Sequence, residues 1–161
     1  MVDVVKIASY ICQRYQMEYG VRIDEMKLHK LLYFAQRESF VQRGEALFES
    51  LFKAWKYGPV LVEIRQLYKS DTLKSDLSDS ELQQCRLILD KVFAQYAQKD
   101  SWSLSSLTHG EYAWKKARLG LSPEENGNVY MAMEDIKRDA ERIRIRRFLL
   151  SKMSVISSTV A

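Results

Sequence analysis

Apolar residues recur along most of the chain at the three- and four-residue spacing of amphipathic helices. The first such stretch covers about residues 3–19 and stops at Gly20; the second follows the potential N-cap Asp24 and stops at Gly44. Because only about five residues separate the two stretches, they are expected to pack as an antiparallel pair. The chain is therefore predicted to begin with two packed helices.

The helical spacing breaks between residues 47 and 57. Apolar and aromatic side chains alternate there, and aromatic residues favour a pleated surface. We predict a short extended segment or hairpin over 47–57, ended by Gly58 and Pro59. Pro59 is expected at the first position of the next helix, because proline lacks only an N–H that is unpaired there anyway.

Further helix starts are predicted by the capping-box pattern, a hydroxyl residue followed three positions later by a carboxylate. The helix that starts at Ser78 is predicted to run to about Tyr96. The helix that starts at Thr108 is short and ends near Arg118, and the helix that starts at Ser122 runs to about Lys152. The last can also start nearer to 126–128, because Gly127 weakens its beginning. The three pairs are Ser78 with Glu81, Thr108 with Glu111, and Ser122 with Glu125.

Composition fits one globular domain. The chain has 161 residues, 47% of them hydrophobic, with only 6 Gly and 2 Pro. We predict a mainly α fold, a compact helical domain of about six to seven helices over residues 1–152, with a flexible tail over 153–161. No apolar run reaches the about 18 residues of a membrane span, and no signal-peptide pattern is present, so we expect a cytoplasmic protein without a membrane partner.

The net charge of +4 is concentrated near the C-terminus. Residues 137–152 carry seven basic and two acidic side chains, whereas the 136 residues before them carry 18 basic and 19 acidic ones. At about 100° per residue the arginines of this segment spread around the helix, which favours a solvated face. A protein-binding surface or, least favoured, a nucleic-acid contact are the alternatives. The arginines are Arg142, Arg144, Arg146 and Arg147.

Candidate catalytic chemistry is sparse. Cys12 and Cys85 stand far apart among apolar neighbours, so neither a CxxC pair nor a cysteine zinc site can be written. His29 and His109 have no second histidine at metal-ligand spacing, and no nucleotide-binding or hydrolase motif is present. We therefore predict no enzyme, no catalytic residues, no metal and no cofactor. A hydrolase would require one histidine to meet a Ser, Cys or carboxylate in the fold.

Three segments of the chain together resemble one family, the Panacea domain of SocA-like antitoxins, also described as GepA-like phage-associated proteins. The segments are KLHKLLYFAQ at residues 27–36, AWKYGPV at 54–60, and SLTHGEYAW at 106–114 followed by KA at 116–117. The second is the most specific. His29 departs from the usual pattern, in which Gln is common.

The resemblance implies an antitoxin of a bacterial or prophage toxin–antitoxin system, which neutralises a cognate protein toxin by direct binding. It names no toxin, and it leaves self-association of the chain open. The alternative is an adaptor or transcriptional autorepressor that uses the basic C-terminal helix.

The expected toxin-binding face combines one side of the second helix with the turn that carries Trp55 and Tyr57. Polar side chains at three- and four-residue spacing should lie beside the buried stripe with their ends outward. The corner residues Trp55, Tyr57, Gly58 and Pro59 also have a structural explanation, which is the favoured one, because they suit the turn from strand to helix, and the leucines suit a core. The candidate contacts are His29, Lys30, Tyr33, Gln36, Trp55 and Tyr57.

Overall fold

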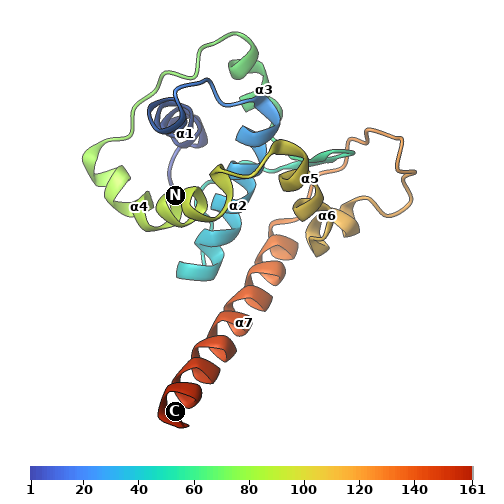
Figure 1. The fold of residues 1–161 in the computed structure, drawn as a ribbon. Coiled ribbons are helices and arrows are strands. Elements are labelled where there is room, and N and C mark those ends of the chain that lie inside the picture. Colours follow the sequence, from blue (N-terminus) through green and yellow to red (C-terminus); the bar gives the residue numbers. More distant parts are fainter. Residues whose placement is uncertain (161) are drawn as a thin grey trace.

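The computed structural model describes residues 1–160, with side chains described through Ser158. The described part is mainly α-helical and contains one small antiparallel hairpin, as the sequence predicts (Figure 1). In chain order the elements are α1 (Val4–Tyr19), α2 (Glu25–Arg43), β1 (Lys53–Trp55), β2 (Gly58–Val60), α3 (Val62–Lys69), α4 (Asp79–Val92), the π-helical turn η1 (Phe93–Ala97), α5 (Ser101–His109), α6 (Tyr112–Ala117) and α7 (Met133–Val160).

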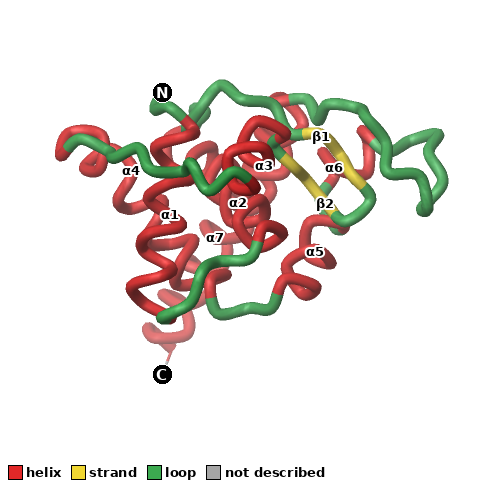
Figure 2. Tube along the Cα trace, turned by 90° about the horizontal axis from the view of Figure 1, so that it is seen from above, coloured by secondary structure: helices red, strands yellow, loops and turns green. Residues whose placement is uncertain are grey.

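Helix α2 is the centre of the fold. It contacts α1, α3, α4, α5, η1, α7 and β2, and every residue from Lys27 to Val41 is buried. Figure 2 shows α1 and α4 on one side of it and the hairpin with α5 and α6 on the other. A helix covered on all sides has no solvent-facing stripe, so its polar side chains must find partners inside the protein.

The ends of the first two helices lie where the sequence predicts them. Carboxylate oxygens of Asp3 and Asp24 accept hydrogen bonds from Val5 N and Lys27 N, and Gly20 and Gly44 close the helices in the left-handed conformation. The predicted capping box at α4 is also confirmed: Ser78 and Glu81 bond each other's backbone N–H.

The capping box predicted at Thr108 and Glu111 is wrong. Thr108 lies inside α5, where its hydroxyl donates to Ser105 O at 2.7 Å. The N-terminus of α6 is instead capped from α7, because Asp139 accepts bonds from Tyr112 N and Ala113 N at 3.0 and 2.9 Å. A local pattern cannot reveal a cap that comes from about 27 residues further along the chain.

The helix predicted to start at Ser122 is also absent: Ser122 and Glu125 lie in a turn, and α7 begins at Met133. Arg118 holds this loop by donating to the carbonyl oxygens of Ser122, Glu125 and Asn126. Helix α7 then continues to Val160, beyond the predicted end near residue 152, and most of the expected tail at 153–161 is helical.

The hairpin is shorter than predicted and shifted along the chain. Ala54 pairs with Pro59 in its register, so Pro59 belongs to β2, and α3 starts only at Val62. Proline is tolerated there because a strand at a sheet edge can leave one N–H position unused. Backbone bonds from Ala54 N to Val129 O and from Met131 N to Phe52 O fasten the loop before α7 to β1.

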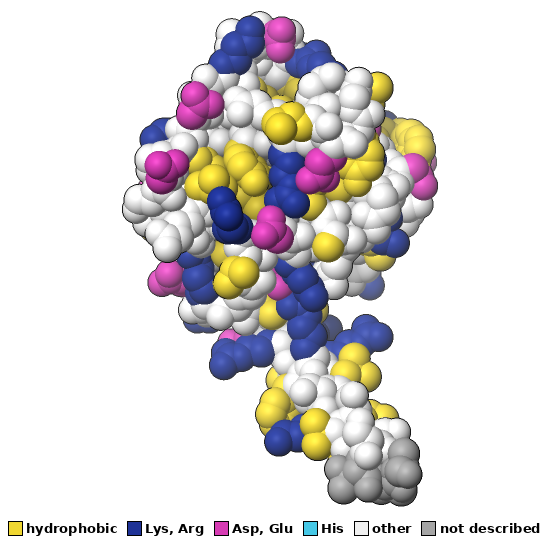
Figure 3. All heavy atoms as spheres, turned by 60° about the vertical axis from the view of Figure 1, so that its left-hand side comes forward, with side chains coloured by type: hydrophobic (Ala, Val, Ile, Leu, Met, Phe, Trp, Pro, Cys, Tyr) yellow, Lys and Arg dark blue, Asp and Glu magenta, His cyan; other side chains and the backbone are white. Residues whose placement is uncertain are grey.

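Helix α7 leaves the body of the protein. Its first part packs against α2 and α6, and its last turns project beyond all other elements (Figure 1). In Figure 3 this projection carries exposed hydrophobic and basic side chains. Among the described residues, no helix is both long and apolar enough to cross a membrane.

Candidate functional site

The predicted contact residues of α2 are buried, which corrects the expectation of an outward polar face. His29, Lys30, Tyr33 and Gln36 are each no more than 1% exposed. Their spacing is that of the flank of an amphipathic helix, but the hairpin and the neighbouring helices cover that flank. These side chains therefore cannot touch a partner directly in this conformation.

Three of these polar side chains hold the backbone of residues 47–61. The amide of Gln36 donates to Phe48 O at 2.8 Å and accepts from Leu47 N at 2.7 Å. His29 Nδ1 accepts from Leu61 N at 3.3 Å, and Lys30 Nζ donates to Pro59 O at 3.2 Å. Buried polar groups are retained when they satisfy backbone groups that would otherwise be unpaired. The family segment in α2 thus fixes the hairpin.

The turn of the hairpin touches Lys30 and α5 closely. A Cβ on Gly58 would lie 2.5 Å from Lys30 Cε and 2.6 Å from Thr108 Oγ1. One turn earlier, Ser105 Oγ donates to Tyr57 O at 2.6 Å. The glycine at this position is therefore required by the contact between the second and third family segments.

The third segment, with Arg118 just after it, donates hydrogen bonds to the backbone of β1. Trp114 Nε1 donates to Trp55 O at 2.9 Å, and Arg118 donates to Ala54 O at the same distance. His109 stacks on Trp114 with ring centroids 4.1 Å apart. The second family segment thus forms the hairpin, and the first and third hold it from two sides, through Lys30 and Trp114.

Burial changes the titration of Lys30. It lowers the pKa of this amine to about 7, against partial opposition from the charges of Glu25 and Asp24. Burial also lowers the pKa of His29, although the neighbouring Glu25 acts in the other direction. In both cases the charged form is disfavoured in the folded protein.

The Lys30 pKa predicts a pH-dependent stability. The unfolded chain keeps this lysine protonated up to about pH 10, whereas the folded protein releases the proton near pH 7, so the free energy of unfolding should rise with pH above 7. Between pH 7.0 and 8.5, below the ordinary pKa of the two thiols, the gain from Lys30 should be about 1.5 kcal/mol. Urea denaturation of the wild type and Lys30→Met across this range measures it. Parallel slopes would contradict the assignment.

A buried ion pair lies behind the hairpin. Arg37 on α2 pairs with Glu111 and donates to the Tyr96 hydroxyl at 2.6 Å. Burial raises the pKa of Glu111, and Arg37 opposes that shift. Next to this pair, Arg147 of α7 bonds both carboxylate oxygens of Glu38, at 2.7 and 2.9 Å. These pairs fasten α2 to α6 and α7.

The hairpin turn and α5 together present an exposed aromatic pair. Tyr57 is 47% and Trp102 61% exposed, and their rings meet edge to face with centroids 5.3 Å apart. Lys56 lies over the Tyr57 ring. We call Lys56, Tyr57 and Trp102 the aromatic corner. Trp55 is only half-buried and faces Arg65, so of the six candidate contacts Tyr57 alone is fully at the surface.

Trp102 is absent from the predicted site because the start of α5 is not among the predicted helix starts. A local signal for it exists: Asp100 caps the helix by accepting from Ser103 N at 2.9 Å. It also passed over the large apolar residues of the projecting part of α7. There, Ile145, Phe148, Leu149, Met153 and Ile156 are each more than half exposed. Their three- and four-residue spacing in the sequence predicts an apolar helix face. The surface predicted for this segment rests only on the charge of the neighbouring arginines.

The predicted basic residues do not form one surface. Arg142, Arg144 and Arg146 are exposed, whereas Arg147 is engaged by Glu38. Arg142 lies within cation–π range of Tyr112. The arrangement agrees with the spread expected from the helical repeat.

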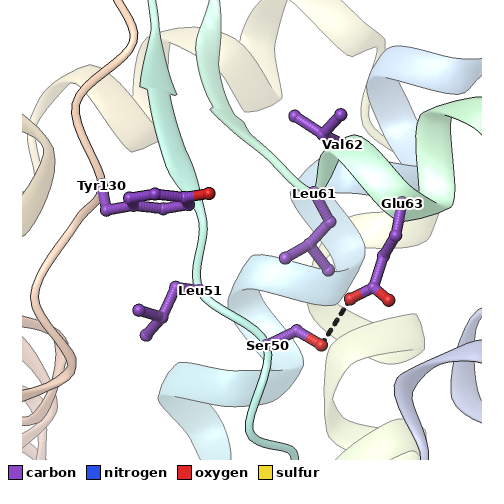
Figure 4. Close-up of a pocket in the computed structure, with 6 residues that line it drawn as sticks. All are labelled: Ser50, Leu51, Leu61, Val62, Glu63 and Tyr130. Carbon is purple, nitrogen blue, oxygen red and sulfur yellow. Dashed lines mark hydrogen bonds between the residues drawn. The ribbon is translucent and has the colours of Figure 1, made fainter.

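A surface pocket of about 360 Å³ lies beside β1 and the start of α3 (Figure 4). Ser50 donates to Glu63 at 2.5 Å across its rim, and Leu51, Leu61 and Val62 make much of the rest apolar. Neither histidine lines this pocket. Among the described residues, no cluster of three His, Cys, Asp or Glu side chains could hold a metal ion.

His29 does approach a carboxylate, as a hydrolase would require, but not in a usable form. Its Nε2 lies 3.4 Å from Glu25 Oε2, and its Nδ1 already accepts from Leu61 N. A neutral imidazole with a bonded acceptor nitrogen has no lone pair free to take a proton from a nucleophile. The histidine is a structural link between α2 and the start of α3.

Comparison with known proteins relates the chain to one family. Over 59 residues the chain is 45% identical to "Antitoxin SocA" of Caulobacter vibrioides (strain NA1000 / CB15N). These aligned residues make up 37% of this chain and 31% of that protein. The chain thus matches about a third of the length of this curated relative. No solved structure matches. A family model, "Antitoxin SocA-like, Panacea domain", matches residues 28–115, more than half of the chain.

The matched range begins in α2 and ends in α6, so it contains the hairpin and the helices that brace it, while α1 and α7 lie outside. The three segments noted in the sequence fall almost entirely within it. The chain belongs to the SocA-like antitoxin family with the Panacea domain.

Proposed function

We propose that this protein is the antitoxin of a toxin–antitoxin pair, and that it neutralises a cognate protein toxin by direct, non-enzymatic binding. Membership of the SocA-like family supports the role. The observation that carries the binding mode is the aromatic corner, where the exposed rings of Tyr57 on the hairpin turn and Trp102 on α5 meet edge to face. Tyr and Trp are enriched among the residues that dominate binding energy at protein interfaces.

In this proposal the buried polar residues of α2 act indirectly. Lys30, Gln36 and His29 fix the backbone around the hairpin, and the hairpin presents Tyr57. A preformed surface binds with less loss of conformational entropy than a mobile one. The single domain over residues 1–152 is part of the same proposal, since α7 contributes the Asp139 cap and the Arg147 bond to the body.

The test is rescue of growth in cells that coexpress the neighbouring open reading frame. That product should arrest growth alone, and this protein should restore it. The double variant Tyr57→Ala, Trp102→Ala should lose rescue, because truncating two central aromatic contacts costs about 2 kcal/mol or more each. Soluble yield and melting temperature should stay close to wild type, since both rings are exposed.

The matched control is Met17→Ala, Leu87→Ala, which removes two exposed apolar side chains from α1 and α4. It should rescue as well as the wild type. If both double variants lost rescue of growth to the same degree, the effect would not be local to the aromatic corner. A neighbouring product that is harmless, or that the wild type fails to silence, would refute the antitoxin role itself.

A further inference from the structure

The projecting part of α7 has an apolar face that nothing in the described structure covers. Between residues 145 and 156 large apolar side chains follow the i, i+3, i+4, i+8, i+11 positions of one helix face. We call this set the α7 stripe. It consists of Ile145, Phe148, Leu149, Met153 and Ile156.

The α7 stripe is not a continuation of the core-facing side of the helix. At about 100° per residue, the buried Ile136 and Ala140 point roughly opposite to Ile145 and Ile156. Exposed Arg138 and Arg142 share the stripe's side of the helix closer to the body. The stripe therefore faces away from the molecule. The opposite face of the projecting turns carries Arg147, the exposed Leu150 and the serines Ser151, Ser154 and Ser158.

The charges around the stripe define what could cover it. After Glu141 the chain has no acidic residue, while Arg144, Arg146 and Lys152 are basic and exposed. Lys152 lies within the arc of the stripe, over the Phe148 ring. A second copy of this segment would supply no carboxylate to any of these cations. An acidic surface on a different protein would complement them.

The same features disfavour the other surfaces that bind basic helices. Helices that lie on membranes carry several lysines and arginines on the polar face, whereas here the face opposite the stripe has no basic residue after Arg147, and Lys152 interrupts the apolar face. For a nucleic acid the basic side chains should all share one face; Arg142 and Arg146 lie on the same side of the helix, but Arg144 points in a widely different direction.

We infer that the α7 stripe is a second contact surface for the toxin, and that it docks as a helix into an apolar groove with a carboxylate opposite Lys152. This inference rests on the proposed antitoxin role and names the surface that would serve it. It matches the general mode in which one amphipathic helix lays its apolar face into a groove of its partner.

The test measures binding of the purified full-length chain to the product of the neighbouring open reading frame. Leu149→Asp, Ile156→Asp should raise the dissociation constant at least about 100-fold, because two aliphatic side chains that the complex would bury are replaced by negative charges facing an acidic groove. Lys152→Glu should raise it about 10-fold. The matched control, Ser151→Asp, Ser158→Asp, adds the same charges at the same seven-residue spacing on the opposite face and should stay within about 3-fold.

A milder pair guards against loss of the helix itself. Leu149→Ala, Ile156→Ala preserves helix propensity, so circular dichroism should match the wild type while the dissociation constant rises about 10-fold. Tight wild-type binding with no effect of either stripe pair would overturn the inference and leave the antitoxin role standing. Absence of wild-type binding would refute the antitoxin role instead.

Three further results would reassign the stripe and so overturn the inference. One is a wild-type dimer in light scattering that Leu149→Asp, Ile156→Asp converts to a monomer. Another is stripe-dependent binding to vesicles of three parts phosphatidylcholine and one part phosphatidylserine. The third is stripe-dependent binding to duplex DNA.

Discussion

Replacing Gly58 with Ala should lower the free energy of unfolding by about 3 kcal/mol or more. Two causes add at this position. Its φ of 114° is rarely adopted by residues with a side chain, and a Cβ would meet Lys30 Cε at 2.5 Å and Thr108 Oγ1 at 2.6 Å. Because Lys30 and Thr108 are both completely enclosed, neither can move aside cheaply. Denaturant unfolding of wild type and variant measures the loss.

Gly20→Ala separates the two causes. Gly20 also has a positive φ, 73°, but nothing lies within 4 Å of the position that its Cβ would take. This variant should lose only about 1–2 kcal/mol from backbone strain. An equal loss at Gly20 and Gly58 would mean that the contact between the hairpin turn, Lys30 and Thr108 adds nothing to the requirement for glycine.

The first two helices were predictable because their signals are local. Asp24 caps α2 through an amide three residues away, and Gly44 ends it by adopting a conformation that glycine prefers. The fold class follows from the same kind of information. Such signals depend on a few neighbouring residues, and those neighbours are present in any context in which the helix forms.

The burial of α2 was not predictable in this way. A lysine or a glutamine on a helix flank usually faces water, and Lys30 and Gln36 depart from this rule only because carbonyl oxygens of Pro59 and Phe48 meet them. Those partners lie 29 and 12 residues away. Only the tertiary fold brings them together, so the sequence pattern alone suggested a contact surface where the protein has a buried scaffold.

The candidate site was therefore predicted in its neighbourhood but not in its members. The corner at Tyr57 is exposed as expected. Its ring partner Trp102 comes from α5, a helix that has a local cap in Asp100 but only a few apolar residues, and no local signal shows that it packs beside the hairpin turn. In α7 the sequence shows the arginines as a cluster of positive charge, whereas the surface proposed to bind the toxin consists of the exposed apolar residues near them. Apolar spacing predicts a helix face, but only the structure shows that nothing covers it.

Replacing Arg37 with Met should lower the free energy of unfolding by about 3–5 kcal/mol at neutral pH. The change leaves the Glu111 carboxylate buried without its cation, and it removes the donor to the Tyr96 hydroxyl. Breaking one side of a buried pair costs more than removing both, because the remaining charge keeps its desolvation penalty. Arg37→Met with Glu111→Gln should therefore be more stable than Arg37→Met alone.

The loss in Arg37→Met should also depend on pH in a defined direction. Burial already raises the pKa of Glu111, and without Arg37 nothing opposes that shift, so the folded variant keeps a proton that the unfolded chain releases above about pH 4.5. The Glu111 contribution to the free energy of unfolding must then fall, relative to the wild type, as pH rises from 5 to 8. Urea denaturation at both pH values should show a deficit that grows toward pH 8 in Arg37→Met, whereas with Glu111→Gln added it should be constant. A pH-independent deficit in Arg37→Met would mean that Glu111 finds water or another cation once Arg37 is gone, and that α2 and α6 are not held together by a closed ion pair.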